Sequence, residues 1–153
     1  VLERFTPPYR CDDLADYEHN SHKLIDTRFF QDAYYNVVVE THINNLFLTE
    51  KTFKPILNLQ PFVIVGASGS LQLLHELGYK TFGDYIDESY DSIEDPEQRL
   101  KQCLHTVEQI SLMSHSEHMV DQHDMRQILL YNQRHFLSDK SAKLLTLLDT
   151  ISQ

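Results

Sequence analysis

The feature that most constrains this chain is a pair of short apolar runs with a helical pattern between them. Residues 34–40 and 61–66 are rich in β-branched and aromatic residues and almost continuously apolar, as strands buried on both faces are. Between them, Phe53, Ile56 and Leu57 follow the i, i+3, i+4 spacing of a helix. Because strands that alternate with helices pair in parallel through right-handed crossovers, this order predicts a Rossmann-like α/β sheet.

A second helix is expected directly after the second strand. Leu71, Leu74 and Leu77 repeat at helical spacing, and Gly78 can end the helix in a left-handed cap. Residues 79–82 then predict a third short strand. The expected order is therefore strand, helix, strand, helix, strand.

The C-terminal third is expected to be helical. Asp95 suits an N-cap and Pro96 suits the first helical position of a helix after an acidic connector. The apolar face expected for this helix consists of Leu100, Leu104, Val107, Ile110 and Leu112. Two further helical patterns follow, one over residues 125–136 and one over residues 144–151.

The composition fits one ordinary domain. The chain has 153 residues, 41% of them hydrophobic, and no apolar run long enough for a membrane span. We interpret residues 1–33 as an N-terminal arm or short helices, and residues 34–153 as a single Rossmann-like domain. Because no signal-peptide pattern is present and Cys11 and Cys103 fit two reduced thiols, a cytoplasmic location is expected.

The charge limits the partners of the chain. A formal net charge of −10 argues against a general nucleic-acid-binding protein, which needs a basic face to neutralise phosphates. A single bound diphosphate is compatible with this charge, because one lysine and a helix N-terminus can supply a local positive potential.

A charged helix start follows the first strand. Glu40 ends that strand, and Thr49 can cap the next helix so that Glu50, Lys51 and free backbone N–H groups face one crevice. Thr41 can donate a hydrogen bond to a phosphate. Since ligands bind beyond the carboxyl ends of parallel strands, this arrangement predicts a site for a phosphorylated ligand.

A turn after the second strand reaches the same edge of the predicted sheet. Ser68, Gly69 and Ser70 lie in a Gly-rich strand-to-helix connection whose N–H groups can face a phosphate. The alternative is that the turn is only a tight connection. It carries neither a Walker lysine nor a dinucleotide fingerprint.

The residues after the first strand resemble the donor-binding signature of the fucosyltransferases. In that signature a strand ending Phe-Glu-Asn-Ser is followed by Asp-Tyr-Ile-Thr-Glu-Lys. Here Glu40 and the run Thr49-Glu50-Lys51 match, and the two glutamates are ten residues apart, as in the motif. The wider run over residues 47–91 is similar to uncharacterised glycosyltransferase-like proteins of phages and aquatic microbes.

This resemblance implies the C-terminal, nucleotide-sugar-binding half of a GT-B-type glycosyltransferase. Glu50 would hold the ribose hydroxyls and Lys51 the diphosphate of a nucleotide diphosphate sugar, with a GDP-linked sugar as the suggested donor. The scheme needs no metal and no other cofactor. Chemistry supports both roles, because a carboxylate accepts hydrogen bonds from two vicinal hydroxyls and an ammonium stabilises a departing diphosphate.

The chain departs from the family pattern at several positions. Thr41 and His42 stand where the family has Asn-Ser, and Leu46 and Phe47 stand where it has Asp-Tyr, which leaves the base, the sugar and the acceptor open. The acceptor-binding half and its general base are not found in the sequence. We therefore assign no catalytic residue, and expect the chain to bind the donor while a missing N-terminal half holds a glycan or other acceptor.

Two alternatives from other classes remain. The first is a non-catalytic scaffold or interaction domain that keeps the fold without the ligand. The second, a phosphate-ester hydrolase, needs a metal-binding carboxylate cluster that the sequence does not provide. His115, His118, His123 and Asp124 suggest metal ligands, but their spacing favours a solvated helix junction, so no metal site is predicted.

Overall fold

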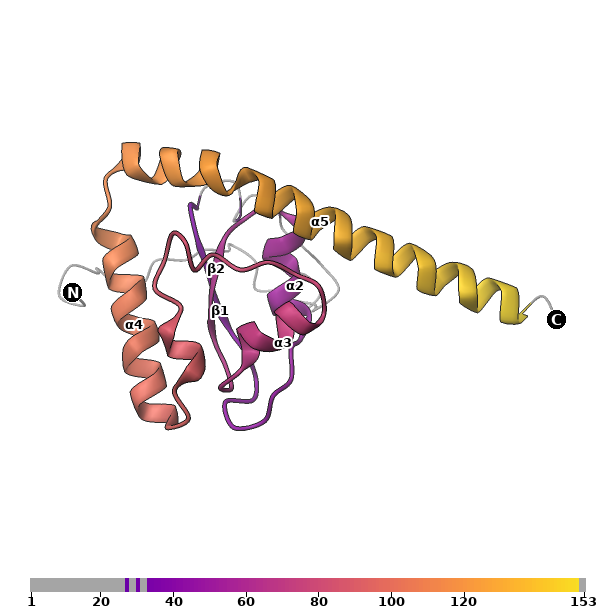
Figure 1. Ribbon diagram of the computed structural model, residues 1–153, viewed down its shortest axis with the longest axis horizontal. Coiled ribbons are helices and arrows are strands. Elements are labelled where there is room, and N and C mark those ends of the chain that lie inside the picture. Colours follow the sequence, from indigo (N-terminus) through magenta and orange to yellow (C-terminus); the bar gives the residue numbers. More distant parts are fainter. Residues whose placement is uncertain (1–26, 28–29, 31–32, 152–153) are drawn as a thin grey trace, which may run out of the picture.

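The computed structural model describes residues 27, 30 and 33–151, and gives only the backbone for residue 122 and residues 139–151. In chain order the elements are β1 (Asn36–Val39), α2 (Glu50–Leu57), β2 (Phe62–Val65), α3 (Ser70–Glu76), the short 3-10 helix η2 (Ser89–Ser92), α4 (Pro96–Leu112) and α5 (His115–Ile151). The strands lie at the centre, with α4 on one side, α2 and α3 on the other, and α5 across one end (Figure 1). The chain is a mixed α/β protein. The arm predicted for residues 1–33 lies almost entirely outside the described residues.

The two predicted strands are confirmed and pair in parallel. β1 and β2 align so that Asn36 lies opposite Phe62 and Val38 opposite Ile64, and α2 connects them. Each strand is shorter than its apolar run in the sequence, although the Asn36 N–H still donates to the Pro61 carbonyl and the Glu40 N–H to the Val65 carbonyl. The buried core includes Val38, Ile56, Phe62, Val63, Ile64, Leu71, Leu74, Phe82, Tyr90, Cys103 and Met125.

The predicted third strand at residues 79–82 is wrong. This segment lies beside α5, and the buried side chain of Asn132 takes the place of a neighbouring strand. Its amide accepts a hydrogen bond from the Lys80 N–H at 2.9 Å and donates one to the Lys80 carbonyl at 2.8 Å. Glu88 accepts another from the Phe82 N–H at 2.8 Å. Because side chains satisfy these backbone groups, the segment has no need of a strand partner.

Side chains also close the outer edge of β2. The Ile64 N–H donates to the Tyr90 hydroxyl at 3.3 Å, and the Cys103 thiol lies 3.7 Å from the Ile64 carbonyl. Arg99 Nε donates to the Gly66 carbonyl at 2.9 Å. These contacts fill the positions that a further strand would use, so the sheet cannot extend beyond β2.

The outer edge of β1 is open in the part of the chain that the structure describes. The N–H groups of Asn36 and Glu40 donate to carbonyls on the β2 side. Because backbone N–H groups alternate in direction along a strand, the N–H groups of Val37 and Val39 point away from β2. The side chains of Val37 and Val39 are 45% and 58% exposed. An unpaired, apolar strand edge of this kind is a template for pairing with another strand.

The predicted ends of α2 and α3 are confirmed. Thr49 caps α2, and Pro55 lies inside this helix of eight residues. α3 ends at Glu76, just before the predicted glycine cap: Gly78 has a φ of +88°, and the Tyr79 N–H reaches back to the Leu74 carbonyl. A Cβ at Gly78 would lie 2.9 Å from the ring of His135, so only glycine fits there.

α4 begins as predicted but buries a different face. Asp95 caps it and Pro96 is its first residue. Its buried positions are Arg99, Cys103 and Thr106, while the predicted core residues Leu100, Leu104 and Leu112 are exposed. The helix is rotated in this way because its polar side chains bond to the backbone of other segments. Val107 and Ile110 pack on the core as expected.

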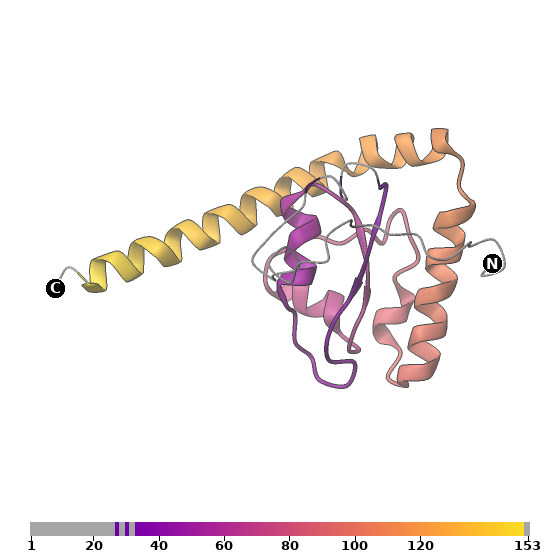
Figure 2. The same ribbon diagram turned by 180° about the vertical axis from the view of Figure 1, so that it is seen from behind.

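The two predicted C-terminal helical patterns form one helix, α5, of 37 residues. Met125, Leu129 and Phe136 bury its first half against the core. The C-terminal part of the helix, in yellow, extends away from the other elements (Figure 2). Among the described helices, none has both the length and the apolar character needed to cross a membrane.

We predict that Asn132→Leu lowers the free energy of unfolding by about 2–3 kcal/mol, because the N–H and carbonyl of Lys80 lose their partners. Urea denaturation measures the change. Gln109→Leu, at an exposed position of α4, is the control and should stay within about 0.5 kcal/mol of wild type. Equal stability of Asn132→Leu and the control would contradict the role given to Asn132.

Candidate functional site

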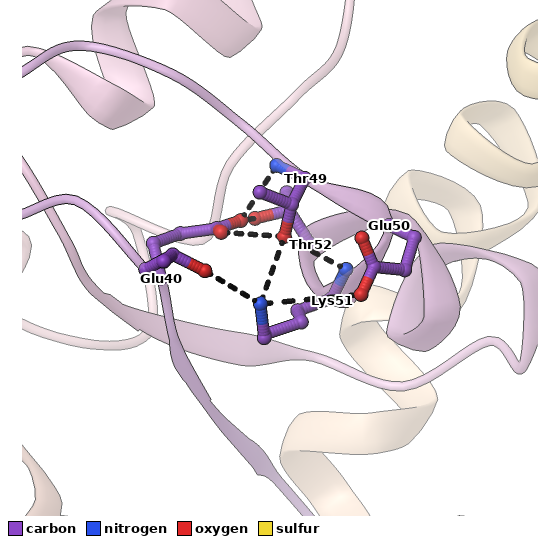
Figure 3. Close-up of polar contacts among 6 residues, drawn as sticks. Glu40, Thr49, Glu50, Lys51 and Thr52 are labelled. Atoms are coloured by element: carbon purple, nitrogen blue, oxygen red, sulfur yellow. Dashed lines mark hydrogen bonds and ion pairs between the residues drawn. The ribbon is translucent and has the colours of Figure 1, made fainter. Parts of the chain in front are cut away.

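Glu40 is the buried centre of the predicted site. Its side chain is only 3% exposed at the carboxyl end of β1. One carboxylate oxygen accepts from the Thr49 N–H at 3.0 Å and from the Thr52 hydroxyl at 2.6 Å, and the other accepts from the Thr49 hydroxyl at 2.6 Å (Figure 3). We call these three hydrogen bonds the Glu40 clasp. They tie the end of β1 to the start of α2.

The clasp keeps Glu40 ionised. Burial raises the pKa of its carboxyl group, but the hydrogen bonds from Thr49 and Thr52 and the charge of Lys51 lower it by more, so the pKa lies below its usual value. Because its oxygens already accept three hydrogen bonds, Glu40 acts as a positioning residue and is not an open ligand group.

Lys51 lies on the exposed side of the clasp. Its Nζ donates to the Thr41 hydroxyl at 3.0 Å and to the Thr49 hydroxyl at 3.4 Å. The Glu50 carboxylate is 3.9 Å from the same nitrogen, and both side chains are 41% exposed. The structure thus brings together five predicted site residues from the end of β1 and the first turn of α2.

The turn at residues 68–70 is arranged differently from the predicted phosphate site. The carboxylate of Asp91 accepts from the N–H groups of Leu71 and Gln72 at 2.9 and 3.0 Å, and the Asp91 carbonyl accepts from the Gly69 N–H. A carboxylate of the chain itself therefore occupies the start of α3 where a phosphate was expected. The turn is therefore a tight connection, which was the alternative interpretation of the sequence.

The hydroxyls of the same turn are also engaged within the protein. Ser68 donates to the Asp91 carbonyl at 3.0 Å, and Ser70 donates to the Ala67 carbonyl at 2.7 Å. Gly69 supplies the backbone conformation, with a φ of +79°. Ser68, Gly69 and Ser70 therefore hold η2 against α3. The candidate site consists only of the residues around Lys51.

Arg99 supports the site and was missed by the sequence analysis. Its guanidinium is buried and donates to four carbonyl groups, those of Ile43, Gly66, Ile93 and Glu94, at 2.6–2.9 Å. It thereby joins the loop after β1 to the end of β2. The sequence feature that could have identified Arg99 is its spacing from Cys103 and Thr106, which places three polar or small side chains on one face of α4.

The predicted solvated histidine junction is wrong for His118. Its ring is buried and stacks on Tyr34 with the ring centroids 4.4 Å apart, and His115 hydrogen-bonds the Tyr34 hydroxyl. These contacts hold the start of α5 against the residues that precede β1. Among the described residues, no three histidine, cysteine or acidic side chains converge closely enough to hold a metal ion.

Comparisons of this chain with protein-family models, with curated proteins and with solved structures find no match. The resemblance to the fucosyltransferase signature therefore rests on Glu40, Thr49, Glu50 and Lys51 and on their spacing.

We predict that Glu40→Gln destabilises the protein by about 2–3 kcal/mol at neutral pH, because hydrogen bonds to a charged acceptor are lost. The folded pKa of Glu40 is lowered, so its contribution is full above the unfolded value of 4.5 and is lost as the pH falls through the folded pKa. The difference between wild type and variant should therefore shrink below pH 4.5.

Urea denaturation at several pH values measures this effect. Glu50→Gln is the matched control, because its carboxylate is exposed, and should change stability by less than about 0.5 kcal/mol at neutral pH. A pH-independent difference between wild type and Glu40→Gln would contradict the assignment.

Proposed function

We propose that this chain is a nucleotide-diphosphate-sugar-binding domain of a glycosyltransferase. The observation that carries the proposal is the position of Lys51. Its exposed ammonium lies in the first turn of α2, at the carboxyl end of β1, beside Thr41 and Glu50. Parallel α/β proteins bind their ligands at this end of the strands.

Lys51 would bind the diphosphate. An ammonium group has three donor hydrogens, and the hydroxyls of Thr41 and Thr49 engage two of them. The remaining donor and the positive end of α2 favour a phosphate oxygen. The Thr41 hydroxyl is next to this position and can donate to a second phosphate oxygen.

Glu50 would bind the ribose. Its exposed carboxylate is next to Lys51 on the same helical turn, and a carboxylate accepts hydrogen bonds from two vicinal hydroxyls. Glu40 and Thr49 do not need to contact the donor in this arrangement. They hold the first turn of α2 in place through the Glu40 clasp.

The β1–α2–β2 unit supports a Rossmann-like domain of the GT-B type. Its strands are parallel and joined by a helix, which is the repeating unit of that fold. Because side chains close the outer edge of β2, any further strand would add at β1. Since no general base is identified among these residues, we propose donor binding, with acceptor binding and transfer dependent on another half of the enzyme.

We predict that calorimetric titration detects binding of at least one of GDP, UDP and ADP. Lys51→Ala should weaken this binding by about tenfold or more, because a charge-assisted contact to the diphosphate is lost. Lys54→Ala removes the same charge later in α2 and should leave the affinity within about twofold. No saturable binding at millimolar ligand, or binding unchanged by Lys51→Ala, would contradict the proposal.

A second candidate function is a non-catalytic interaction domain. The open edge of β1 favours it, because Val37 and Val39 are exposed and no proline, lysine or glycine protects residues 36–39. An extended segment of another chain, including a second copy of this one, can add to such an edge through main-chain hydrogen bonds.

Sedimentation experiments over a range of concentrations test edge pairing between copies. We predict a concentration-dependent dimer in wild type that Val39→Lys abolishes, because a charged lysine on an edge strand opposes pairing with another strand. Leu104→Lys changes an equally exposed apolar residue on α4 and should keep the dimer. A monomer at all concentrations in wild type would remove self-association as a basis for this candidate.

A further inference from the structure

An open surface pocket of about 510 Å³, which we call the cavity, lies away from the Lys51 site. It is formed by Lys80 and by one face of α5, with a lining of Lys80, Gln127, Leu130, Tyr131, Arg134, His135 and Ser138. This part of α5 contacts the C-terminal end of α2, where Gln133 donates to the Leu57 carbonyl, whereas Lys51 is in the first turn of that helix. The cavity is therefore a separate site, and it has a size typical of pockets for small organic ligands.

Lys80 is held in place at the wall of this cavity. The buried Asn132 bonds both its N–H and its carbonyl, which fixes the backbone at this position. The Lys80 ammonium lies over the ring of Tyr131, with Nζ 4.7 Å from the ring centroid. This cation–π contact orients the charge without neutralising it.

The neighbouring aromatic wall is also fixed. The Tyr131 hydroxyl donates to the Gly78 carbonyl at 3.1 Å, and His135 Nε2 lies 2.8 Å from the Leu77 carbonyl. The rings of Tyr131 and His135 are nearly parallel, with an angle of 5° between their planes. These contacts join α5 to the end of α3, so the aromatic wall is ordered before a ligand binds, which lowers the entropic cost of binding.

The lining of the cavity is positively charged. It contains Lys80 and Arg134 but no carboxylate, in a chain whose net charge is −10. Within the described residues, neither cation forms an ion pair with an acidic side chain. Two exposed cations without an acidic partner at one surface pocket give it a local positive potential that attracts an anion.

We propose that this cavity binds a small organic phosphate. The planar guanidinium of Arg134 donates two parallel hydrogen bonds to a phosphate group, and the Lys80 ammonium supplies the second charge. Leu130 offers an apolar surface to the organic part of the ligand, and the Gln127 amide offers polar contacts to its hydroxyls. The site does not depend on donor binding at Lys51.

Calorimetric titration with ribose 5-phosphate, inorganic phosphate and ribose tests the proposal. Ribose 5-phosphate should bind saturably and more tightly than inorganic phosphate, and ribose should show no binding. Arg134→Gln and Lys80→Ala should each weaken binding of ribose 5-phosphate by about tenfold or more. Thermal unfolding followed by circular dichroism verifies that each variant is folded.

Two control variants distinguish binding in this cavity from general attraction to α5 and from binding at Lys51. Arg126→Gln removes a charge from the same helix outside the cavity, and Lys51→Ala removes the proposed donor site; both should leave the affinity within about twofold. Equal loss in Arg126→Gln would show general attraction to α5 and overturn the proposal. Three other outcomes would also overturn the proposal. They are a loss of binding in Lys51→Ala alone, no saturation at millimolar ribose 5-phosphate, and equal affinity for inorganic phosphate and ribose 5-phosphate.

Discussion

The hydrogen bonds to the Glu40 carboxylate set the geometry on which the candidate site depends. A buried carboxylate is costly unless its oxygens are paired, and here Thr49 and Thr52 supply the donors. Because Thr49 also caps α2, the same contacts fix where the helix starts and which side of its first turn meets solvent. Lys51 and Glu50 are exposed beside the end of β1 as a consequence.

Side chains in this protein often replace the hydrogen bonds of a larger sheet. Asn132 pairs with the backbone of Lys80, and Tyr90, Cys103 and Arg99 close the edge of β2. The chain can therefore bury two parallel strands without a third one beside β2. The hydrogen bonds from Asn132 also fix the backbone of Lys80 at the wall of the cavity on α5. The contact that replaces a neighbouring strand therefore also positions a residue of the proposed phosphate site.

Local signals in the sequence predicted the elements and part of the site. Thr49, Asp95 and Gly78 mark helix ends through contacts within a few residues, and the structure confirms all three. The cluster around Lys51 was predictable for the same reason, because Glu40 and Thr49 are separated by only 9 positions. Apolar runs also identified both strands.

The predictions failed where distant polar residues decide the structure. Asp91 fills the start of α3 from 20 positions away, and Arg99 reaches Gly66 across 33 positions. No periodic pattern identifies such partners, so the sequence could not decide between a phosphate site and a tight connection at the start of α3. The buried face of α4 was misassigned because Arg99 and Thr106 are polar and Leu100 and Leu104 are not, although hydrogen bonding to the backbone decides which face turns inward.

The most direct test of this account is a titration of ¹⁵N-labelled protein with GDP, followed through the backbone amide signals. If a nucleotide diphosphate binds beside the Glu40 clasp, the amides of Thr41, Glu50 and Lys51 will shift and saturate together, and Lys51→Ala will abolish these shifts. Amide signals of these three residues that stay unchanged at saturating millimolar GDP would contradict donor binding at this site.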